Sequence, residues 1–212
     1  VYKCVACNAI MIDQTVFKDK KAIYYTLGCK LNFSETSTIE RQLQEAGIRT
    51  ARRGEKADIC IINSCAVTQE AEKKCRQVIH KLVRQNPGAY VVVTGCYAQL
   101  SAEKLAKESG VDVVLGIAKK GEVLEHLGAL VKHNDGGEWH AQPSKDVRNF
   151  VHSCSRGDRT RYFLKVQDGC DYFCTYCTIP FARGRSRNPL VSELVEQAQK
   201  AVAEGGKEIV IT

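Results

Sequence analysis

The stretch Ala57-Asp58-Ile59-Cys60-Ile61-Ile62-Asn63-Ser64-Cys65 sets the class of fold. Its apolar run has the length of a strand, and such near-continuous runs are typical of parallel strands buried on both faces of a sheet. A helical pattern follows over residues 69–85 and stops at Asn86-Pro87-Gly88, because proline and glycine end helices. We therefore expect a strand followed by a helix, the unit from which parallel sheets are built.

The same pattern recurs on both sides of this stretch. The further predicted elements are strands at residues 21–27, 90–94 and 111–115 and helices after Ser34, after Ser101 and at residues 119–130. Serine is a favoured N-cap, which is why two of the helices are placed after serines. Strands that alternate with helices indicate a parallel sheet with right-handed crossovers. The predicted fold class is α/β, with an open parallel α/β domain over residues 21–130.

Residues 131–160 have the composition of an inter-domain linker. Apolar periodicity is lost there, and glycines, a proline and mixed charges gather. The chain then shows the start of a second domain over residues 161–212, in which strands at residues 161–166 and 207–212 flank a helix at residues 190–204. One such unit leaves most of its apolar surface exposed, so we expect it to need further elements, and the sequence looks truncated at its C-terminal end.

Residues 1–20 are expected to be an N-terminal extension. Met11 is the only methionine, so the natural start is expected there, with residues 1–10 upstream of it. Cys4 and Cys7 form a C-x2-C pair that would make half of a zinc site, but no second pair lies nearby to complete it. We therefore leave both cysteines out of the candidate sites.

Composition limits the class of protein. The 212 residues are 44% hydrophobic, yet no apolar run approaches the ~20 residues of a membrane helix, and no signal peptide opens the chain, so we expect a cytoplasmic protein. The net charge of +7 makes a polyanion a plausible partner. Eleven cysteines, an odd number in a cytoplasmic setting, favour metal-binding or catalytic thiols over a disulfide framework.

Three cysteines occupy equivalent places in the predicted α/β domain. Cys29, Cys65 and Cys96 each stand just past the end of a strand, and about one β-α-β unit separates each from the next. Ligands of open parallel sheets bind outside the carboxyl ends of the strands, so we expect these three thiols, the first triad, to meet at one sheet edge. The alternative for each is a buried, inert thiol, as is common for free cysteine.

A second triad lies in Gly169-Cys170-Asp171-Tyr172-Phe173-Cys174-Thr175-Tyr176-Cys177. The C-x3-C-x2-C spacing lets one loop aim three thiolates at a point. A structural zinc site would want four ligands, so three thiolates suit a 4Fe-4S cluster with one iron free to bind another molecule. A zinc site or three unrelated thiols is the alternative.

Arginines flank the second triad. They are Arg183, Arg185 and Arg187 after it and Arg156, Arg159 and Arg161 before it. All are candidate contacts for nucleic-acid phosphates, and a solvated basic face is the alternative.

The remaining cysteines and the histidines show no such pattern. Cys60 falls within a strand and Cys75 within a helix, so both are expected to be core or surface thiols, and Cys154 has no cysteine at ligand spacing in the linker. The scattered histidines are expected to be solvated; they are His126, His133, His140 and His152.

Taken together, the cysteine motifs resemble those of the methylthiotransferases, a family of radical S-adenosylmethionine enzymes. The motifs are Thr26-Leu27-Gly28-Cys29-Lys30-Leu31-Asn32, Asn63-Ser64-Cys65-Ala66-Val67-Thr68 and Thr94-Gly95-Cys96-Tyr97-Ala98-Gln99, besides the second-triad loop. The resemblance covers about residues 21–212. The Gly-Cys-Lys-x-Asn and Asn-Ser-Cys-Ala-Val-Thr sequences look most like the branch that acts on N6-threonylcarbamoyladenosine beside the tRNA anticodon.

The resemblance implies a reaction and its cofactors. Methylthiolation at C2 of the adenine would give 2-methylthio-N6-threonylcarbamoyladenosine in tRNA, with S-adenosylmethionine and two 4Fe-4S clusters. The second triad would hold the cluster that cleaves S-adenosylmethionine to a radical, and the first triad would hold the cluster that carries the sulfur. The resemblance also implies an electron donor of flavodoxin or ferredoxin type, and a partial (β/α) barrel that begins at residue 161. The fragment alone is expected to be inactive.

Two alternatives remain open at the level of sequence. One is a sibling enzyme that acts on isopentenyladenosine in tRNA or on a ribosomal protein. The other is a non-catalytic RNA-binding module with structural zinc at one or both triads, which metal analysis would distinguish from an iron-sulfur protein.

Overall fold

The computed structural model describes residues 14–66, 68–128, 130–132, 136–155 and 161–212. Cys4, Cys7, Met11, His133, Arg156 and Arg159, which entered the sequence analysis, lie outside these residues. Of the expected N-terminal extension, the described part contains a short 3-10 helix, η1 (Gln14–Phe17).

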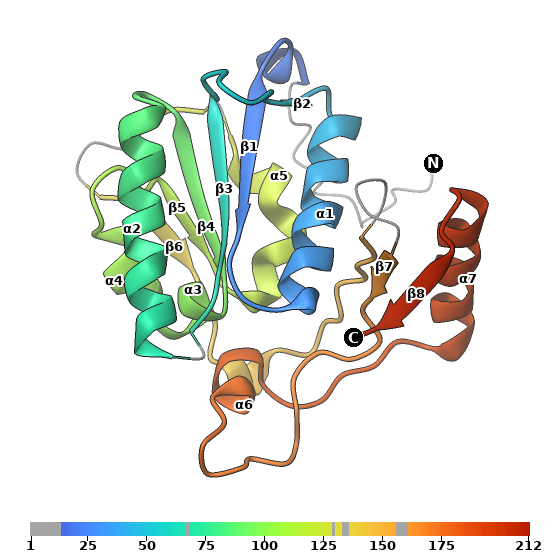
Figure 1. The fold of residues 1–212 in the computed structure, drawn as a ribbon. Helices are drawn as coiled ribbons and strands as arrows, with labels where there is room; N and C mark the ends of the chain where they lie inside the picture. Colours follow the sequence, from blue (N-terminus) through green and yellow to red (C-terminus); the bar gives the residue numbers. More distant parts are fainter. Residues whose placement is uncertain (1–13, 67, 129, 133–135, 156–160) are drawn as a thin grey trace, which may run out of the picture.

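A six-stranded parallel sheet forms the larger part of the molecule (Figure 1). Its strand order is β2-β1-β3-β4-β5-β6, and every neighbouring pair is parallel. The strands are β1 (Lys21–Thr26), β2 (Arg49–Thr50), β3 (Ile59–Ser64), β4 (Tyr90–Gly95), β5 (Val113–Leu115) and β6 (Glu138–His140). The predicted α/β fold class and the parallel sheet are confirmed.

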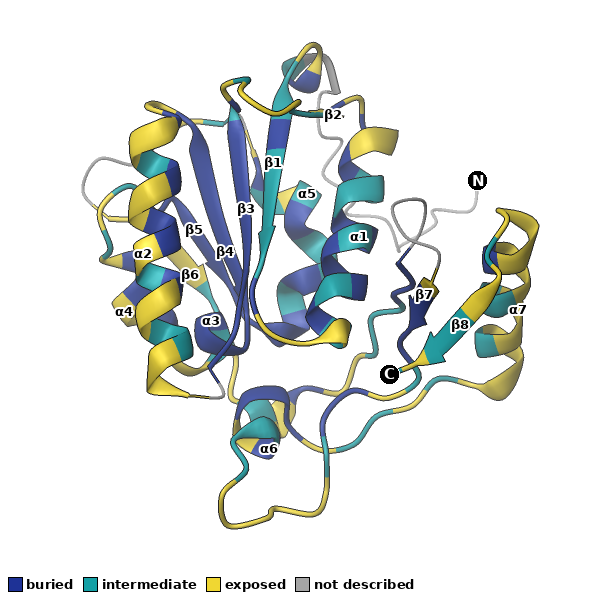
Figure 2. Ribbon diagram, in the orientation of Figure 1, coloured by how far each residue is buried: buried dark blue, intermediate teal, exposed yellow. Residues whose placement is uncertain are grey.

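Helices cover both faces of the sheet. They are α1 (Lys30–Glu45), α2 (Gln69–Gln85), α3 (Cys96–Leu100), α4 (Ala102–Ala106), the 3-10 helix η2 (Ile117–Glu122) and α5 (Val123–His126). The fully buried strands β3 and β4 alternate between two cores: Ile59 and Ile61 pack with residues of α1 and α5, whereas Cys60 and Ile62 pack with residues of α2, α3 and α4. Figure 2 shows the buried strands between helices whose outer faces are exposed.

A second, two-stranded unit lies beside α1. It consists of β7 (Arg161–Leu164) paired in parallel with β8 (Glu208–Ile211), with α6 (Ile179–Arg183) and α7 (Val191–Ala203) between them in the chain. The ring of Phe163 meets the ring of Phe33 edge-on, with 5.8 Å between centroids, which packs β7 against α1. The order of strand, helix and strand expected for residues 161–212 is thus observed, with an additional short helix, α6, after the second triad.

Two predictions about helices were wrong. Helix α1 begins at Lys30 with Cys29 as its N-cap, because the chain turns at Gly28 straight into the helix. Ser34 therefore lies inside α1, where its hydroxyl donates to the Leu31 carbonyl at 2.9 Å. The helix expected at residues 119–130 is replaced by η2 and the short α5.

The predicted linker at residues 131–160 is in part an element of the sheet. Residues Glu138–His140 form β6, which pairs with β5. A short edge strand that is largely exposed needs no apolar pattern, which is why composition alone suggested a linker. A further 3-10 helix, η3 (Ser144–Asp146), follows. The Ser155 amide then donates to the Phe163 carbonyl of the second unit, and the Lys165 amide donates to the Ser153 carbonyl.

No helix among the described residues is both long and apolar enough to cross a membrane.

The junction between α2 and β3 generates a test of the fold. Asn86 is buried, accepts a hydrogen bond from the Ala57 amide at 2.8 Å and donates to the Leu82 carbonyl at 3.1 Å. The Leu82 carbonyl also accepts from the backbone amide of Asn86 at 2.9 Å, so Asn86→Ala leaves only the Ala57 amide without its partner. The change should lower the free energy of unfolding by about 1–3 kcal/mol, measured by chemical denaturation. Gln85→Ala, at the exposed last position of α2, is the control. Equal effects of the two changes would contradict this account of the junction.

Candidate functional site

The first triad lies at the carboxyl ends of three adjacent strands, β1, β3 and β4 (Figure 1). Cys29 lies three residues beyond the end of β1, Cys65 directly follows β3, and Cys96 directly follows β4 as the first residue of α3. This edge is the place where open parallel sheets bind ligands. Cys65 and Cys96 are 8% and 4% exposed, whereas Cys29 is exposed to solvent.

Asn32 joins the loops that carry Cys29 and Cys65. Its buried amide group donates to the Leu27 carbonyl at 2.8 Å and to the Ser64 carbonyl at 3.1 Å. The Cys29 thiol in turn donates to Asn32 Oδ1, with 3.9 Å between Sγ and Oδ1. The one side chain therefore fixes the ends of two strands against each other and touches a thiol of the first triad.

Ser64 and Gly95 join the loops that carry Cys65 and Cys96. The Ser64 hydroxyl donates to the Thr94 carbonyl at 2.5 Å and accepts from the Ala98 amide at 3.1 Å. Gly95 has a φ of 101°, and a Cβ at this position would overlap the Ser64 carbonyl oxygen. Only glycine suits a residue with this φ and this close an approach to a neighbouring backbone.

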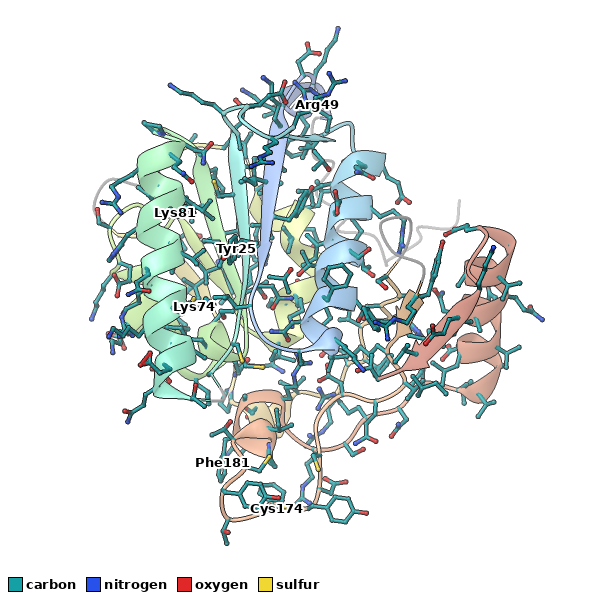
Figure 3. All side chains as sticks on the ribbon, viewed as in Figure 1. Tyr25, Arg49, Lys74, Lys81, Cys174 and Phe181 are labelled. Atoms are coloured by element: carbon teal, nitrogen blue, oxygen red, sulfur yellow. The ribbon has the colours of Figure 1, made fainter. Side chains whose placement is uncertain are left out.

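The second triad lies on a loop that is closed by backbone hydrogen bonds. Asp168 and Arg187 exchange two of them, with N to O distances of 2.9 and 2.8 Å, and the Cys170 amide donates to the Gly184 carbonyl at 3.1 Å. Cys174 is exposed at the far side of the loop, while Cys170 and Cys177 are half-buried. Figure 3 shows Cys174 and Phe181 on this part of the chain, at the opposite end of the molecule from Arg49.

Aromatic residues surround the second triad. The rings of Phe173 and Phe181 meet edge-on with 6.0 Å between centroids, and the Arg185 guanidinium lies 5.3 Å from the centre of the Phe173 ring. Phe173 adopts a φ of 48°, in the left-handed region that is rare for bulky residues. Tyr172 and Tyr176 are almost fully exposed, at 87% and 88%.

The two triads are brought to the same end of the molecule by α6. This helix follows the second triad and packs against α3, which begins with Cys96. Ala182 of α6 is buried in the same core as Cys65 and Cys96. The loop of the second triad is therefore anchored beside the first triad.

The described side chains do not form a site for a single metal ion. Among the described residues, no three histidine, cysteine, aspartate or glutamate side chains are close enough to hold one metal ion. The strand topology brings the first triad to one edge of the sheet, and the meeting of its thiols around one cluster stays a prediction. The donors themselves fit an iron-sulfur cluster, since each triad offers three soft thiols, one of which is exposed to solvent.

A buried ionic cluster joins the two halves of the site. It consists of Glu35, Lys120, Lys165, Asp168 and Arg183, each at most 3% exposed. Arg183 donates to Glu35 Oε1 at 3.0 Å and to Asp168 Oδ1 at 2.8 Å, and Lys165 donates to the same two carboxylates at 3.1 and 2.6 Å. Lys120 completes the cluster at 2.5 Å from Glu35.

Charge explains why this cluster stays ionised. Burial acts to raise the pKa of the Glu35 carboxyl, but the cations around it, Arg183 first, hold that pKa well below its usual value. Burial acts to lower the pKa of the Arg183 guanidinium, but the Glu35 carboxylate beside it keeps that pKa well above its usual value. Burial also lowers the pKa of Lys120, so Lys120 holds its charge less firmly than Arg183 does.

The structure corrects the prediction for Arg183. Its guanidinium is 2% exposed and fully engaged by Glu35, Asp168 and Asn32, so it does not face a phosphate. Arg187 is also turned inward, donating to the backbone carbonyls of Asn149, Arg183 and Arg185. Arg185 remains exposed and lies 3.6 Å from Asp171.

Sequence reasoning missed Asn32, Glu35, Lys120, Lys165 and Asp168 as site residues. One signal was available, because Lys165 interrupts the apolar pattern of residues 162–166 at a buried position. A lysine there calls for a buried carboxylate as partner. The identity of that partner depends on packing between α1 and the second unit, which spacing does not reveal.

Three of the cysteines that the structure describes, Cys60, Cys75 and Cys154, lie outside the triads, and all three are buried. Burial raises the pKa of Cys60 and of Cys75 to about 12, so neither forms thiolate at neutral pH. Both lie in the core on the α2 face of the sheet, as expected for Cys60 and Cys75. Cys154 is likewise buried, between β7 and α7.

Comparison with known proteins finds similar sequences. A family model described as "Uncharacterized protein family UPF0004" matches residues 21–116. The chain is 41% identical over 199 residues to the threonylcarbamoyladenosine tRNA methylthiotransferase MtaB of Bacillus subtilis, covering 89% of this chain and 42% of the relative. It is 37% identical over 196 residues to the MtaB of Aquifex aeolicus, covering 91% of this chain and 47% of the relative.

A relative whose name specifies another substrate is less similar to this chain. The tRNA-2-methylthio-N(6)-dimethylallyladenosine synthase of Trichlorobacter lovleyi is 32% identical over 205 residues, which cover 91% of this chain and 45% of the relative. The chain thus spans less than half the length of these relatives.

Thiol exposure gives a test of the site as described. In metal-free protein treated with iodoacetamide at pH 8, Cys29 and Cys174 should be alkylated first, and Cys60 and Cys75 should react only on unfolding, because alkylation needs an accessible thiolate. Peptide mass spectrometry over a time course measures the order. Early alkylation of Cys75 in folded protein would contradict its placement, and labelling in denaturant provides the control for intrinsic reactivity.

Proposed function

Since the chain belongs to the same family as these tRNA methylthiotransferases, we propose that it is part of an enzyme that methylthiolates an adenosine of tRNA. The observation that carries the proposal is the pairing of two three-cysteine sets, one at the carboxyl ends of β1, β3 and β4 and one on the loop that α6 anchors beside them. An enzyme that must activate an aromatic C–H bond and then supply sulfur needs two such centres close together.

The thiols of each triad are proposed to hold one 4Fe-4S cluster. Cys29, Cys65 and Cys96 would bind the first, and Cys170, Cys174 and Cys177 the second, each with one iron left without a protein ligand. With S-adenosylmethionine bound at the second, such clusters would supply the radical and sulfur chemistry of the reaction. The chain itself orients the two centres through Asn32, Ser64 and α6, and it holds buried charge between them.

N6-threonylcarbamoyladenosine is the proposed substrate nucleoside, with 2-methylthio-N6-threonylcarbamoyladenosine as the product. Relatives whose names specify threonylcarbamoyladenosine share 33–41% identity with this chain, against 27–32% for those that specify dimethylallyladenosine. The Gly-Cys-Lys-x-Asn sequence at residues 28–32 supports the same choice. The structure gives Asn32 of that sequence a defined place, beside Cys29 and Arg183.

The proposed partners are tRNA and a small electron donor of flavodoxin or ferredoxin type, and the proposed location is the cytoplasm. The net charge of +7 suits a polyanion. Among the flanking arginines that the structure describes, Arg161 and Arg185 are exposed and remain the proposed phosphate contacts.

Iron content tests the proposal against a zinc-binding module. A full-length enzyme that contains this chain, reconstituted anaerobically, should bind about eight iron per chain and absorb in the visible. Replacing Cys170, Cys174 and Cys177 by alanine should remove about half of the iron, and Cys75→Ala should remove none. Zinc in place of iron, or loss of all iron from the three-alanine variant, would contradict two independent cluster sites.

The separate chemical roles proposed for the two triads give a second test. If the second triad alone serves reductive cleavage, a full-length variant with Cys29, Cys65 and Cys96 replaced by alanine should still form 5'-deoxyadenosine but transfer no methylthio group to tRNA. The variant of the second triad should do neither. Liquid chromatography with mass spectrometry quantifies both products. Methylthiolated tRNA from the first-triad variant would contradict this assignment of roles. Wild-type enzyme assayed on tRNA that lacks the threonylcarbamoyl group tests the proposed substrate.

A further inference from the structure

The ionic cluster between the triads contains more cations than carboxylates. Lys120, Lys165 and Arg183 surround only Glu35 and Asp168. Within the part of the chain that the structure describes, every ion pair of these three cations is with one of those two carboxylates. Arg187, whose side chain is 8% exposed, adds a further cation 3.5 Å from Asp168.

An excess of buried charge is costly unless something compensates for it. Transfer of an ion from water to a protein interior costs several kcal/mol, and solvent provides no relief here because the side chains of the three inner cations are at most 3% exposed. A site built in this way favours an anion close by. The question is therefore which anion lies next to the excess charge.

The excess charge adjoins the first triad. Arg183 Nη2 donates to Asn32 Oδ1 at 2.6 Å, and this oxygen is also the acceptor of the Cys29 thiol. Ala182, the neighbour of Arg183 in α6, packs in the same core as Cys65 and Cys96. The positive region is therefore joined to Cys29 through Asn32 and lies beside the core that contains the other two cysteines of the first triad.

We propose that the excess positive charge of the ionic cluster compensates the negative charge of the iron-sulfur cluster held by the first triad, and that Glu35 and Arg183 thereby tune its reduction potential. The inference rests on the proposed function, because it takes the first triad to bind such a cluster. An iron-sulfur cluster with three thiolate ligands is anionic, and an added electron makes it more so. Nearby positive charge favours the reduced form, so losing that charge lowers the potential and losing a carboxylate raises it.

The test uses a full-length enzyme in which Cys170, Cys174 and Cys177 are alanine, so that only the cluster of the first triad is observed. Redox titration followed by electron paramagnetic resonance measures its midpoint potential. Arg183→Gln should shift the potential to a more negative value, Glu35→Gln to a more positive value, and Arg183→Lys, which keeps the charge, should shift it less than Arg183→Gln. Arg185→Gln, an exposed arginine two residues away, is the matched control and should leave the potential unchanged.

Opposite shifts from Arg183→Gln and Glu35→Gln support the proposal, since a merely structural role would not give shifts of opposite sign. If the Arg183→Gln variant does not retain the cluster, Lys120→Met is measured in its place, because Lys120 lies on a separate element. This variant should also shift the midpoint potential to a more negative value. Unchanged potentials in variants that retain their iron would overturn this inference alone. If the parent enzyme binds no iron at the first triad, both this inference and the proposed function fail.

Discussion

The contact of Arg183 with Glu35 and Asn32 is the interaction on which the arrangement of the molecule depends. Arg183 ends α6, next to the loop of the second triad, whereas Glu35 and Asn32 lie in the first turns of α1, next to Cys29. Apolar packing alone could not fix this arrangement, because the core between β7, β8 and α7 is small. Charged and hydrogen-bonded groups with fixed geometry specify position more narrowly than apolar contact does.

Much of the fold could be predicted because its signals are local. The strand at residues 57–63 is apolar on both faces, and Asn86-Pro87-Gly88 ends the helix after it, so a parallel sheet followed from the chain alone. Residues 138–140 gave no such signal. An edge strand has only one neighbour and little buried surface, so its backbone bonds to β5 leave no trace in hydrophobic periodicity.

The candidate site, like the fold, could be predicted from the sequence only where its signals are local. The repeated position of Cys29, Cys65 and Cys96 after strands is a local feature, and topology carried it to one edge of the sheet. Arg183, by contrast, is predicted from the sequence to contact a phosphate, because it belongs to a group of arginines that flank the second triad. Its burial depends on Glu35, 148 positions earlier in the chain, and nothing in the spacing of the two residues indicates that they meet.

The amide group of Asn32 has a consequence for how the two halves of the chain can vary. Its nitrogen serves the loops after β1 and β3, and its oxygen serves Arg183 of the second half. Residues that share a partner in this way are energetically coupled, so the effects of substitutions at positions 32 and 183 should not add. A second half from a related chain therefore fits this first half only if it supplies a donor in the place of Arg183, and a first half from a related chain fits only if it supplies an acceptor in the place of Asn32.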